Sequence, residues 1–122
     1  MNRQRPRLRP ILPTLKEKKR YLAFEILSNG KMKDFSDVSR AIWGSLLSFV
    51  GTRGAGEMGV IMIPEKYNAK RQRGLIRVAH TGLDTLRASL ALVQKVGDDD
   101  AIVRSLGASG ILMKAHKKFV EG

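Results

Sequence analysis

The stretch Tyr21-Leu22-Ala23-Phe24-Glu25-Ile26-Leu27-Ser28-Asn29-Gly30 sets the pattern from which the rest of the fold is predicted. Leu22, Phe24 and Ile26 occupy every second position, which is the apolar alternation of a strand with one buried face. Asn29-Gly30 follows with a strong turn signal. We therefore predict a half-buried strand over residues 21–28 that ends at this turn.

Helical and extended segments alternate after this strand. Asp34 or Ser36 can cap a helix with an apolar stripe, and Gly51 follows the predicted end of that helix. Two segments rich in β-branched residues then favour a hairpin, and Thr81 can cap a second helix. Ahead of the first strand, Thr14 can cap a short helical turn. The predicted elements are a helical turn over 14–19, a strand over 21–28, a helix to about residue 50, strands over 57–63 and 73–80, a helix from 81 to about 96, a strand over 101–106 and a helix over 111–119.

This order, β-α-β-β-α-β with one further helix, predicts an α+β fold of the ferredoxin-like class. Such a fold has a four-stranded antiparallel sheet with two helices on one face. RNA-recognition modules share the topology and bind RNA with the other, open face. We expect this sandwich with a C-terminal helix added, and we expect Ile111, Leu112, Ala115 and Phe119 of that helix to cover apolar groups of the sheet.

Length and composition indicate one small domain with a basic N-terminal arm. A chain of 122 residues suffices for one hydrophobic core. Three prolines among four arginines predict an extended arm over 1–13, and a single domain over 14–122 follows it. The lack of cysteine excludes disulfides and cysteine-containing zinc sites, and it fits a cytoplasmic protein. No apolar run approaches the ~18–20 residues of a membrane-spanning helix, so no membrane association is expected.

The charge is strongly basic and unevenly placed. The chain carries 23 Lys and Arg against 11 Asp and Glu, a net charge of +12, and residues 1–20 hold eight of the basic side chains and one acid. Two further clusters lie near the third strand and in the last helix. A field of this kind attracts polyanions, so nucleic acid is the favoured partner. The candidate RNA-binding residues are Arg3, Arg5, Arg7, Arg9, Lys16, Lys18, Lys19, Arg20, Lys70, Arg71, Arg73, Arg77, Arg104, Lys114, Lys117 and Lys118.

Base stacking of the RNA-recognition-module type is not supported. That mode needs aromatic side chains on the open faces of the first and third strands. Arg73-Gly74 opens the third strand as the signature does, but Leu75, Arg77 and Ala79 follow where aromatics belong. Tyr21 is the one aromatic candidate on the first strand. The remaining prediction is a charged surface that contacts phosphate and sugar.

Both long helices carry more apolar surface than a small sheet can cover. Side by side, the extra residues would form an exposed patch of the kind that marks a protein partner. The alternative is a wide core stripe around a small sheet. The candidate partner-binding residues are Trp43, Leu47, Val50, Leu92 and Val96.

The sequence gives little support for catalysis by the protein. His80 and His116 have no acid paired with them nearby in sequence. Asp98, Asp99 and Asp100 can in principle bind Mg²⁺, but an acidic turn is the preferred interpretation. The glycines near residue 54 match no phosphate-binding signature. We predict no catalytic residue, no metal site and no cofactor bound by the protein.

Three stretches together resemble the family of small ribonuclease P proteins of archaea and eukaryotes, called protein component 2 in archaea. The first runs from Leu12 to Phe24, with a proline, a basic run and an aromatic strand. The others are Ala41-Ile42-Trp43 and the R-x-L-G-x-S-G turn within Ile102–Gly110. The resemblance covers residues 12 to about 118, and the lack of a long C-terminal extension is similar to archaeal members.

The resemblance implies a ferredoxin-like subunit of a ribonucleoprotein that removes 5′ leaders from precursor tRNA. In that family the RNA carries the chemistry and requires Mg²⁺. The implied partners are ribonuclease P RNA, precursor tRNA and protein component 3, often as a 2:2 assembly. The rivals are a ribosomal or other RNA-packaging protein of the same topology, a small acyl-phosphate hydrolase and a homodimeric regulatory module joined through the helix faces.

Overall fold

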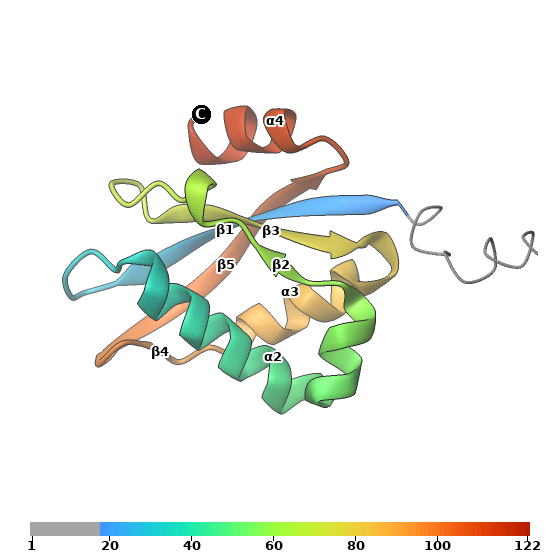
Figure 1. Ribbon diagram of the computed structural model, residues 1–122. Helices are drawn as coiled ribbons and strands as arrows, with labels where there is room; N and C mark the ends of the chain where they lie inside the picture. The colour runs from blue at the N-terminus through green and yellow to red at the C-terminus, as the bar shows by residue number, and fades with distance from the viewer. Residues whose placement is uncertain (1–17) are drawn as a thin grey trace, which may run out of the picture.

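A computed structural model describes residues 18–122, which form one antiparallel sheet with helices on both of its faces (Figure 1). The sheet has five strands in the order β2-β3-β1-β5-β4. Their bounds are β1, Lys19–Ser28; β2, Ile61–Met62; β3, Arg73–Ala79; β4, Lys95–Val96; and β5, Asp99–Ser109. The long strand β1 lies at the centre and pairs with β3 on one side and β5 on the other.

Two α-helices cover one face of the sheet, which we call the inner face (Figure 1). Helix α2 (Phe35–Met58) begins at Asp34, whose side chain accepts a hydrogen bond of 2.9 Å from the backbone N–H of Asp37. Helix α3 (Leu83–Ala91) follows β3 through the short 3₁₀ turn η4 (His80–Gly82). A second 3₁₀ turn, η3 (Pro64–Lys66), follows β2.

The predicted alternation of β1 is confirmed on this inner face. Leu22 and Phe24 are completely buried there, and Ile26 is 4% exposed. They pack against the apolar stripes of α2 and α3, including Ile42 and Leu86. Since burial of one large aliphatic or aromatic side chain contributes about 1.5–3 kcal/mol, this layer supplies most of the hydrophobic stabilisation.

The opposite, outer face carries a smaller apolar cluster under the C-terminal segment. Helix α4 (Leu112–Ala115) continues into the π-helical turn η5 (His116–Val120), and both lie across β1, β3 and β5 (Figure 1). Ala115 and Val120 are fully buried against Ala23 and Leu75 of the sheet. The face that an RNA-recognition module leaves open is therefore largely covered by the end of the chain.

Phe119 fixes how closely this segment approaches the sheet. A Cβ atom placed on Gly107 would lie 2.4 Å from the Phe119 ring, so the aromatic side chain sits directly over the glycine. Leu112 and Phe119 pack at the edge of the outer cluster as predicted, together with Ala115. Ile111 does not, since it is 52% exposed.

Several predicted boundaries are wrong, and the number of strands is five instead of four. Gly51 adopts φ 78° and ψ 170°, which kinks α2 and lets it continue to Met58, so the expected strand over 57–63 shrinks to β2. The second helix ends at Ala91 because the following segment pairs with β5. Gly97, with φ 62°, turns the chain between β4 and β5. Thr81 lies in η4 and caps no helix.

The α+β class is confirmed, while the four-stranded ferredoxin-like description does not cover the added strand β4. The strand over 101–106 extends to 99–109, and the helix over 111–119 is a four-residue α-helix followed by a π-helical turn. The predicted helical turn capped by Thr14 and the arm over 1–13 lie outside the described residues, apart from Lys18 and Lys19.

Candidate nucleic-acid and protein interfaces

A row of three charged side chains crosses the outer face of the sheet. Glu25 on β1 is in register with Arg73 on β3 and Arg104 on β5. The Glu25 carboxylate accepts from Nε of Arg73 at 3.2 Å, and from Nη2 and Nε of Arg104 at 2.6 and 2.8 Å. The Glu25 side chain is 13% exposed and Arg73 is 23% exposed, so this pair is partly shielded from water, whereas the Arg104 side chain is 56% exposed.

Burial and the two arginines act on Glu25 in opposite directions. Desolvation alone would raise the pKa of the Glu25 carboxyl. Hydrogen bonds and charge from Arg104 and Arg73 outweigh it and hold the pKa of Glu25 below its ordinary value of 4.5. Glu25 is therefore ionised at neutral pH and serves as the internal counter-ion of two of the predicted RNA-binding arginines.

The basic loop before β3 contacts the C-terminal segment. Arg73 donates from Nη1 to the carbonyl of Phe119 at 3.1 Å, and Arg71 donates from Nη1 to the carbonyl of Gly122 at 2.8 Å. Lys118 lies over the Phe119 ring at 5.4 Å from its centroid. The predicted cluster near the third strand and the predicted cluster in the last helix thus form one surface. We call it the basic surface, and its members are Lys70, Arg71, Arg73, Arg104, Lys114, Lys117 and Lys118.

The basic run at the start of β1 lies next to His80 and Gly110. Lys18 accepts a backbone hydrogen bond from His80, and Arg20 Nη1 lies close to Gly110, just before α4. Arg77 is in register with Tyr21 and is half-buried, with its Nε atom buried and without a hydrogen-bond partner. The other predicted RNA-binding residues of the N-terminus lie outside the described residues; they are Arg3, Arg5, Arg7, Arg9 and Lys16.

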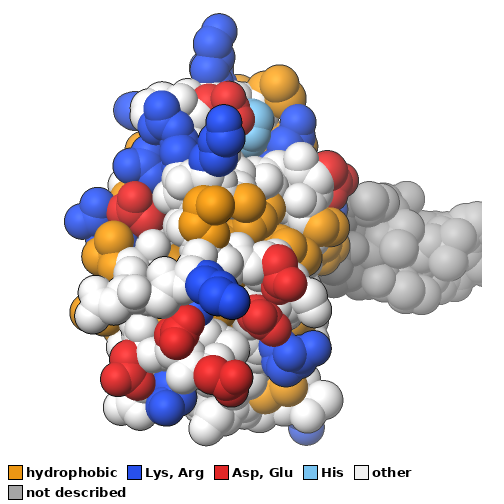
Figure 2. Space-filling view, turned by 90° about the vertical axis from the view of Figure 1, so that its left-hand side faces the viewer, with side chains coloured by type: hydrophobic (Ala, Val, Ile, Leu, Met, Phe, Trp, Pro, Cys, Tyr) orange, Lys and Arg blue, Asp and Glu red, His pale blue; other side chains and the backbone are white. Residues whose placement is uncertain are grey.

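Charge is unevenly distributed along the molecule (Figure 2). Lys and Arg side chains gather at the top, where α4 and η5 lie, and in the lower part Asp and Glu side chains are interspersed with Lys and Arg. Asp37, near the start of α2, and Asp98, in the β4–β5 turn, line one hollow together with Arg40 and Lys95. Lys33, which is 6% exposed, is held in an ion pair with Asp99. A polyanion therefore meets more favourable charge over the C-terminal segment than in the lower part, where acids and bases are mixed.

The predicted partner-binding residues separate into exposed and buried ones. Leu47 is 41% exposed and Leu92 is 55% exposed, and a hollow beside Leu92 is lined by the small residues Ala41, Gly44, Ser45 and Ser48 of α2. Trp43 and Val50 are half-buried and pack against the main core. The prediction for Val96 is wrong, because the residue belongs to β4 and is completely buried.

Neither a metal site nor a membrane-spanning helix is found within residues 18–122. No three His, Cys, Asp or Glu residues in this part of the chain are placed to hold a metal ion. No helix in the same range is long and apolar enough to cross a membrane.

Comparison with known proteins identifies the family to which this chain belongs. The family model described as Rpp14/Pop5 matches residues 20–120, which is most of the chain. The chain belongs to the Rpp14/Pop5 family. Its matched region includes the complete sheet, apart from Lys19, and the C-terminal segment that carries Lys114, Lys117 and Lys118.

Curated relatives of this Rpp14/Pop5 chain are named ribonuclease P protein component 2. The protein from Thermococcus gammatolerans is 34% identical over 97% of this chain and 94% of its own length. The protein from Pyrococcus horikoshii is 34% identical over 93% of this chain and 92% of its own. The protein from Methanosarcina barkeri is 32% identical over 93% of this chain and 81% of its own.

A solved chain in the cryo-EM structure of yeast ribonuclease MRP has a similar fold. The TM-score is 0.62 at 15% sequence identity, and the match covers 86% of this chain and 87% of that chain. At this identity the likeness concerns the fold, and it supports the observed α+β arrangement of the Rpp14/Pop5 chain.

Two features of the outer face were not predicted from the sequence. One is the role of Glu25 as a counter-ion that Arg73 and Arg104 share. The sequence did contain a signal for this ion pairing, because Glu25 lies on the outer side of the first strand and arginines occur in both neighbouring strands. The seating of Phe119 on Gly107 is the other. No local pattern in the sequence marks it, because it depends on how the C-terminal segment crosses the sheet.

Proposed function

We propose that this chain is a protein subunit of ribonuclease P that supports a catalytic RNA in removing 5′ leaders from precursor tRNA. The observation that carries the proposal is the basic surface, in a chain whose family relatives are named as ribonuclease P proteins. The chain contributes no catalytic group in this proposal. The RNA performs the hydrolysis and requires Mg²⁺ to do so.

The proposed mechanism is electrostatic. Folding an RNA active site brings phosphates together, and Lys and Arg side chains reduce their repulsion without additional diffuse Mg²⁺. Lys114, Lys117 and Lys118 are suited to this role, since the 18–122 structure gives them no ion pair with an acid. Arg73 and Arg104 share Glu25 and are partly neutralised, so they contribute less.

The exposed apolar part of the inner helices serves a protein partner in the same proposal. Leu47 is exposed on α2, and Leu92 lines a hollow whose α2 side consists of small side chains and Arg40, which lets a partner approach the backbone of α2 closely. Protein component 3 is the proposed partner, in a cytoplasmic ribonucleoprotein of the archaeal type. A 2:2 assembly or a homodimer is the proposed oligomeric state.

Reconstitution tests this function directly. The chain, the cognate ribonuclease P RNA and protein component 3 are mixed with precursor tRNA, and release of the 5′ leader is measured at several Mg²⁺ concentrations. We expect no cleavage by the polypeptide alone, and cleavage at lower Mg²⁺ when the chain joins the RNA. Leader removal by the polypeptide free of RNA would refute the proposal, as would an RNA whose activity the chain leaves unchanged.

A further inference from the structure

The strand β5 has an outer edge that is paired only at its beginning. Strand β4 pairs with Asp99 and Asp100, and the N–H of Ala101 donates to the carbonyl of Gln94 at 2.9 Å. Beyond Ala101, no strand among the described residues lies next to β5 on that side. The edge from Ile102 to Leu106 is therefore open, and open edges are templates for pairing with another chain.

A hydrogen bond on the far side of β1 shows which backbone N–H and carbonyl groups of β5 face this open edge. The N–H of Ile26 donates to Gln72, beside β3, at 2.8 Å, and Ile26 is in register with Val103. In a central antiparallel strand, the backbone N–H and carbonyl of one residue point to the same side, so a residue whose N–H bonds to one neighbouring strand directs neither group toward the other strand. Val103 therefore directs its N–H and carbonyl away from β1, and Ser105 does the same two residues on. Neither amide has a partner within residues 18–122.

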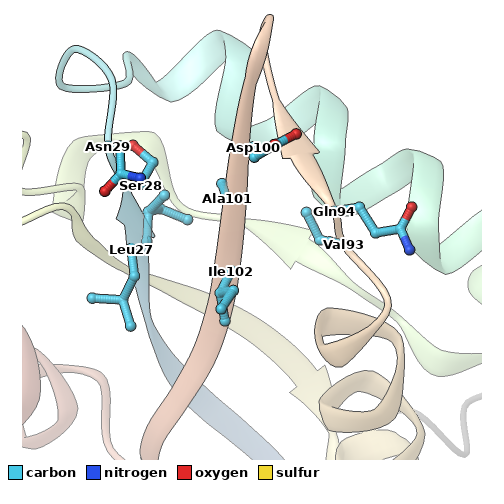
Figure 3. Close-up of a pocket in the computed structure, with 9 residues that line it drawn as sticks. Leu27, Ser28, Asn29, Val93, Gln94, Asp100, Ala101 and Ile102 are labelled. Carbon is cyan, nitrogen blue, oxygen red and sulfur yellow. The ribbon is translucent and has the colours of Figure 1, made fainter.

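Apolar side chains accompany these backbone groups. Leu27 and Ile102 form a cross-strand pair on the outer face and are 43% and 63% exposed, beyond the cover of η5. A hollow of about 620 Å³ lies beside them (Figure 3). Figure 3 shows Leu27 and Ser28 on one side of β5 and Val93 and Gln94 on the other. The hollow and the open edge are thus adjacent.

The charge around the edge selects the kind of partner. Asp100 lines the hollow, its side chain is 92% exposed, and its pair with Lys95 is 3.7 Å long between two exposed groups, which contributes little. Asp98 lies in the turn before β5 and adds a second carboxylate, while Asp99 is paired with Lys33. Phosphates would be repelled by these carboxylates, and an RNA backbone lacks the alternating N–H and carbonyl groups of a strand. A protein segment with a Lys or Arg opposite Asp100 can pair with the carboxylate and can also bond to the open backbone groups of β5.

We propose that the outer edge of β5 accepts one extended strand from a partner protein, which carries an aliphatic side chain against Leu27 and Ile102 and a basic side chain near Asp100. This inference extends the proposed function, because the hollow at the β5 edge and the hollow beside Leu92 share Val93 and Gln94. One partner can therefore contact α2 and continue around the sheet edge. Strand addition supplies affinity through main-chain hydrogen bonds and specificity through alternate side chains.

Amide hydrogen exchange of the full-length chain tests the proposal, with protein component 3 as the probe. We expect the amides of Val103 and Ser105 to exchange at least about tenfold more slowly in the complex, which corresponds to about 1.4 kcal/mol of protection. The amide of Ile61, on the opposite edge of the sheet, should be unaffected. Binding of component 3 without protection of Val103 and Ser105 would overturn this inference and leave the proposed function in place.

A pair of variants gives the matched control. Ile102→Asp should weaken binding of component 3 roughly tenfold, whereas Ile61→Asp, at a residue 48% exposed on β2, should leave the affinity unchanged. Protection already present in the chain alone, or induced by RNA alone, would assign the edge to the chain's own segments or to RNA and overturn the proposal. If the unchanged chain does not bind component 3 at all, the proposed docking and this inference fall together, and leader removal still tests the RNA-supporting role.

Discussion

The two faces of the sheet are built from alternate residues of the same strands, yet they differ in chemistry. On β1, Leu22, Phe24 and Ile26 point to the inner face and are buried by two helices. Between them, Ala23 and Glu25 point to the outer face, where a small apolar cluster adjoins an ionic row. The inner face resembles an ordinary protein core, and the outer face combines packing with charge.

This difference assigns most of the stability to the inner face of the sheet and the proposed RNA binding to the outer face. The inner face buries large apolar side chains between the sheet and two helices. The outer face buries less, and it brings the loop before β3 and the C-terminal segment together through Arg71, Arg73 and Phe119. Substitutions on the inner face should therefore unfold the protein, whereas those on the outer face should change RNA binding at a smaller cost in stability.

The largest expected effect is the loss of an inner-face aromatic. Phe24→Ala should lower the free energy of unfolding by about 3–5 kcal/mol, because Phe24 is completely buried and its removal leaves a cavity. Phe119→Ala on the outer face should cost clearly less, since Phe119 is only partly buried. Urea unfolding of both variants measures the difference, and equal losses would contradict the division between the faces.

Gly107→Ala tests the closest contact of the outer face. The new Cβ would lie 2.4 Å from the Phe119 ring and push the C-terminal segment outward, at a cost of about 1–3 kcal/mol. In a Phe119→Ala background the same change should be nearly neutral, because the obstructing ring is gone. An equal cost in both backgrounds, measured by urea unfolding, would show that the contact with Phe119 is not the cause.

Glu25→Gln tests the ionic row of the outer face, which consists of Glu25, Arg73 and Arg104. The amide keeps an acceptor but loses the charge that pairs with two arginines, so the free energy of unfolding should fall by about 1 kcal/mol at neutral pH. RNA affinity should rise, since Arg73 and Arg104 lose their internal counter-ion. Filter binding at fixed salt measures the affinity, with Glu57→Gln on the exposed end of α2 as the control; weaker RNA binding by Glu25→Gln would contradict this role.

The stability that Glu25 contributes should depend on pH in a defined direction. Its pKa is lowered in the folded state, so the contribution is complete above the ordinary carboxyl value of 4.5 and is lost as pH falls through the lower folded value. The difference in unfolding free energy between the unchanged chain and Glu25→Gln should therefore shrink below about pH 4.5. A difference that stays constant through that range would contradict the assignment.

The smallest expected effect concerns the neutralisation of single phosphates. Replacing Lys117 and Lys118 by Gln should reduce the slope of log affinity against log salt by about 0.7–0.9 for each phosphate that these lysines neutralise. The paired control replaces Lys31 and Lys95, which lie beside the acids of the other end, and should leave the slope unchanged. Equal reductions in the two double variants would mean that RNA binding does not distinguish the two ends.

The inner face was predictable because its pattern is local. The alternation of Leu22, Phe24 and Ile26, the Asp34 cap and the turn at Asn29-Gly30 each depend on a few neighbouring residues. The errors arose where tertiary pairing overrode local preference. Gly51 looked like a helix end and became a kink, and the segment ending in Val96 continued a helical pattern but paired with β5 as strand β4.

The outer face was less predictable because it depends on contacts between distant segments. The basic clusters could be recognised from composition, but their union required the approach of residues 68–73 to the chain end at Gly122. Likewise, Trp43 and Leu47 have the same apolar character in sequence, and only packing shows that Leu47 is the more exposed of the two. Charge predicted the class of partner, and the fold determines which cations are available to it.

The Mg²⁺ requirement of the reconstituted particle tests the central claim most directly. Precursor tRNA cleavage is followed with the unchanged chain and with a variant in which Lys114, Lys117 and Lys118 are replaced by Gln. The account predicts that the variant needs a higher Mg²⁺ concentration for half-maximal cleavage and reaches the same maximal rate when Mg²⁺ is in excess. An unchanged Mg²⁺ midpoint, with the variant still bound to the RNA, would contradict the claim that these cations support the RNA.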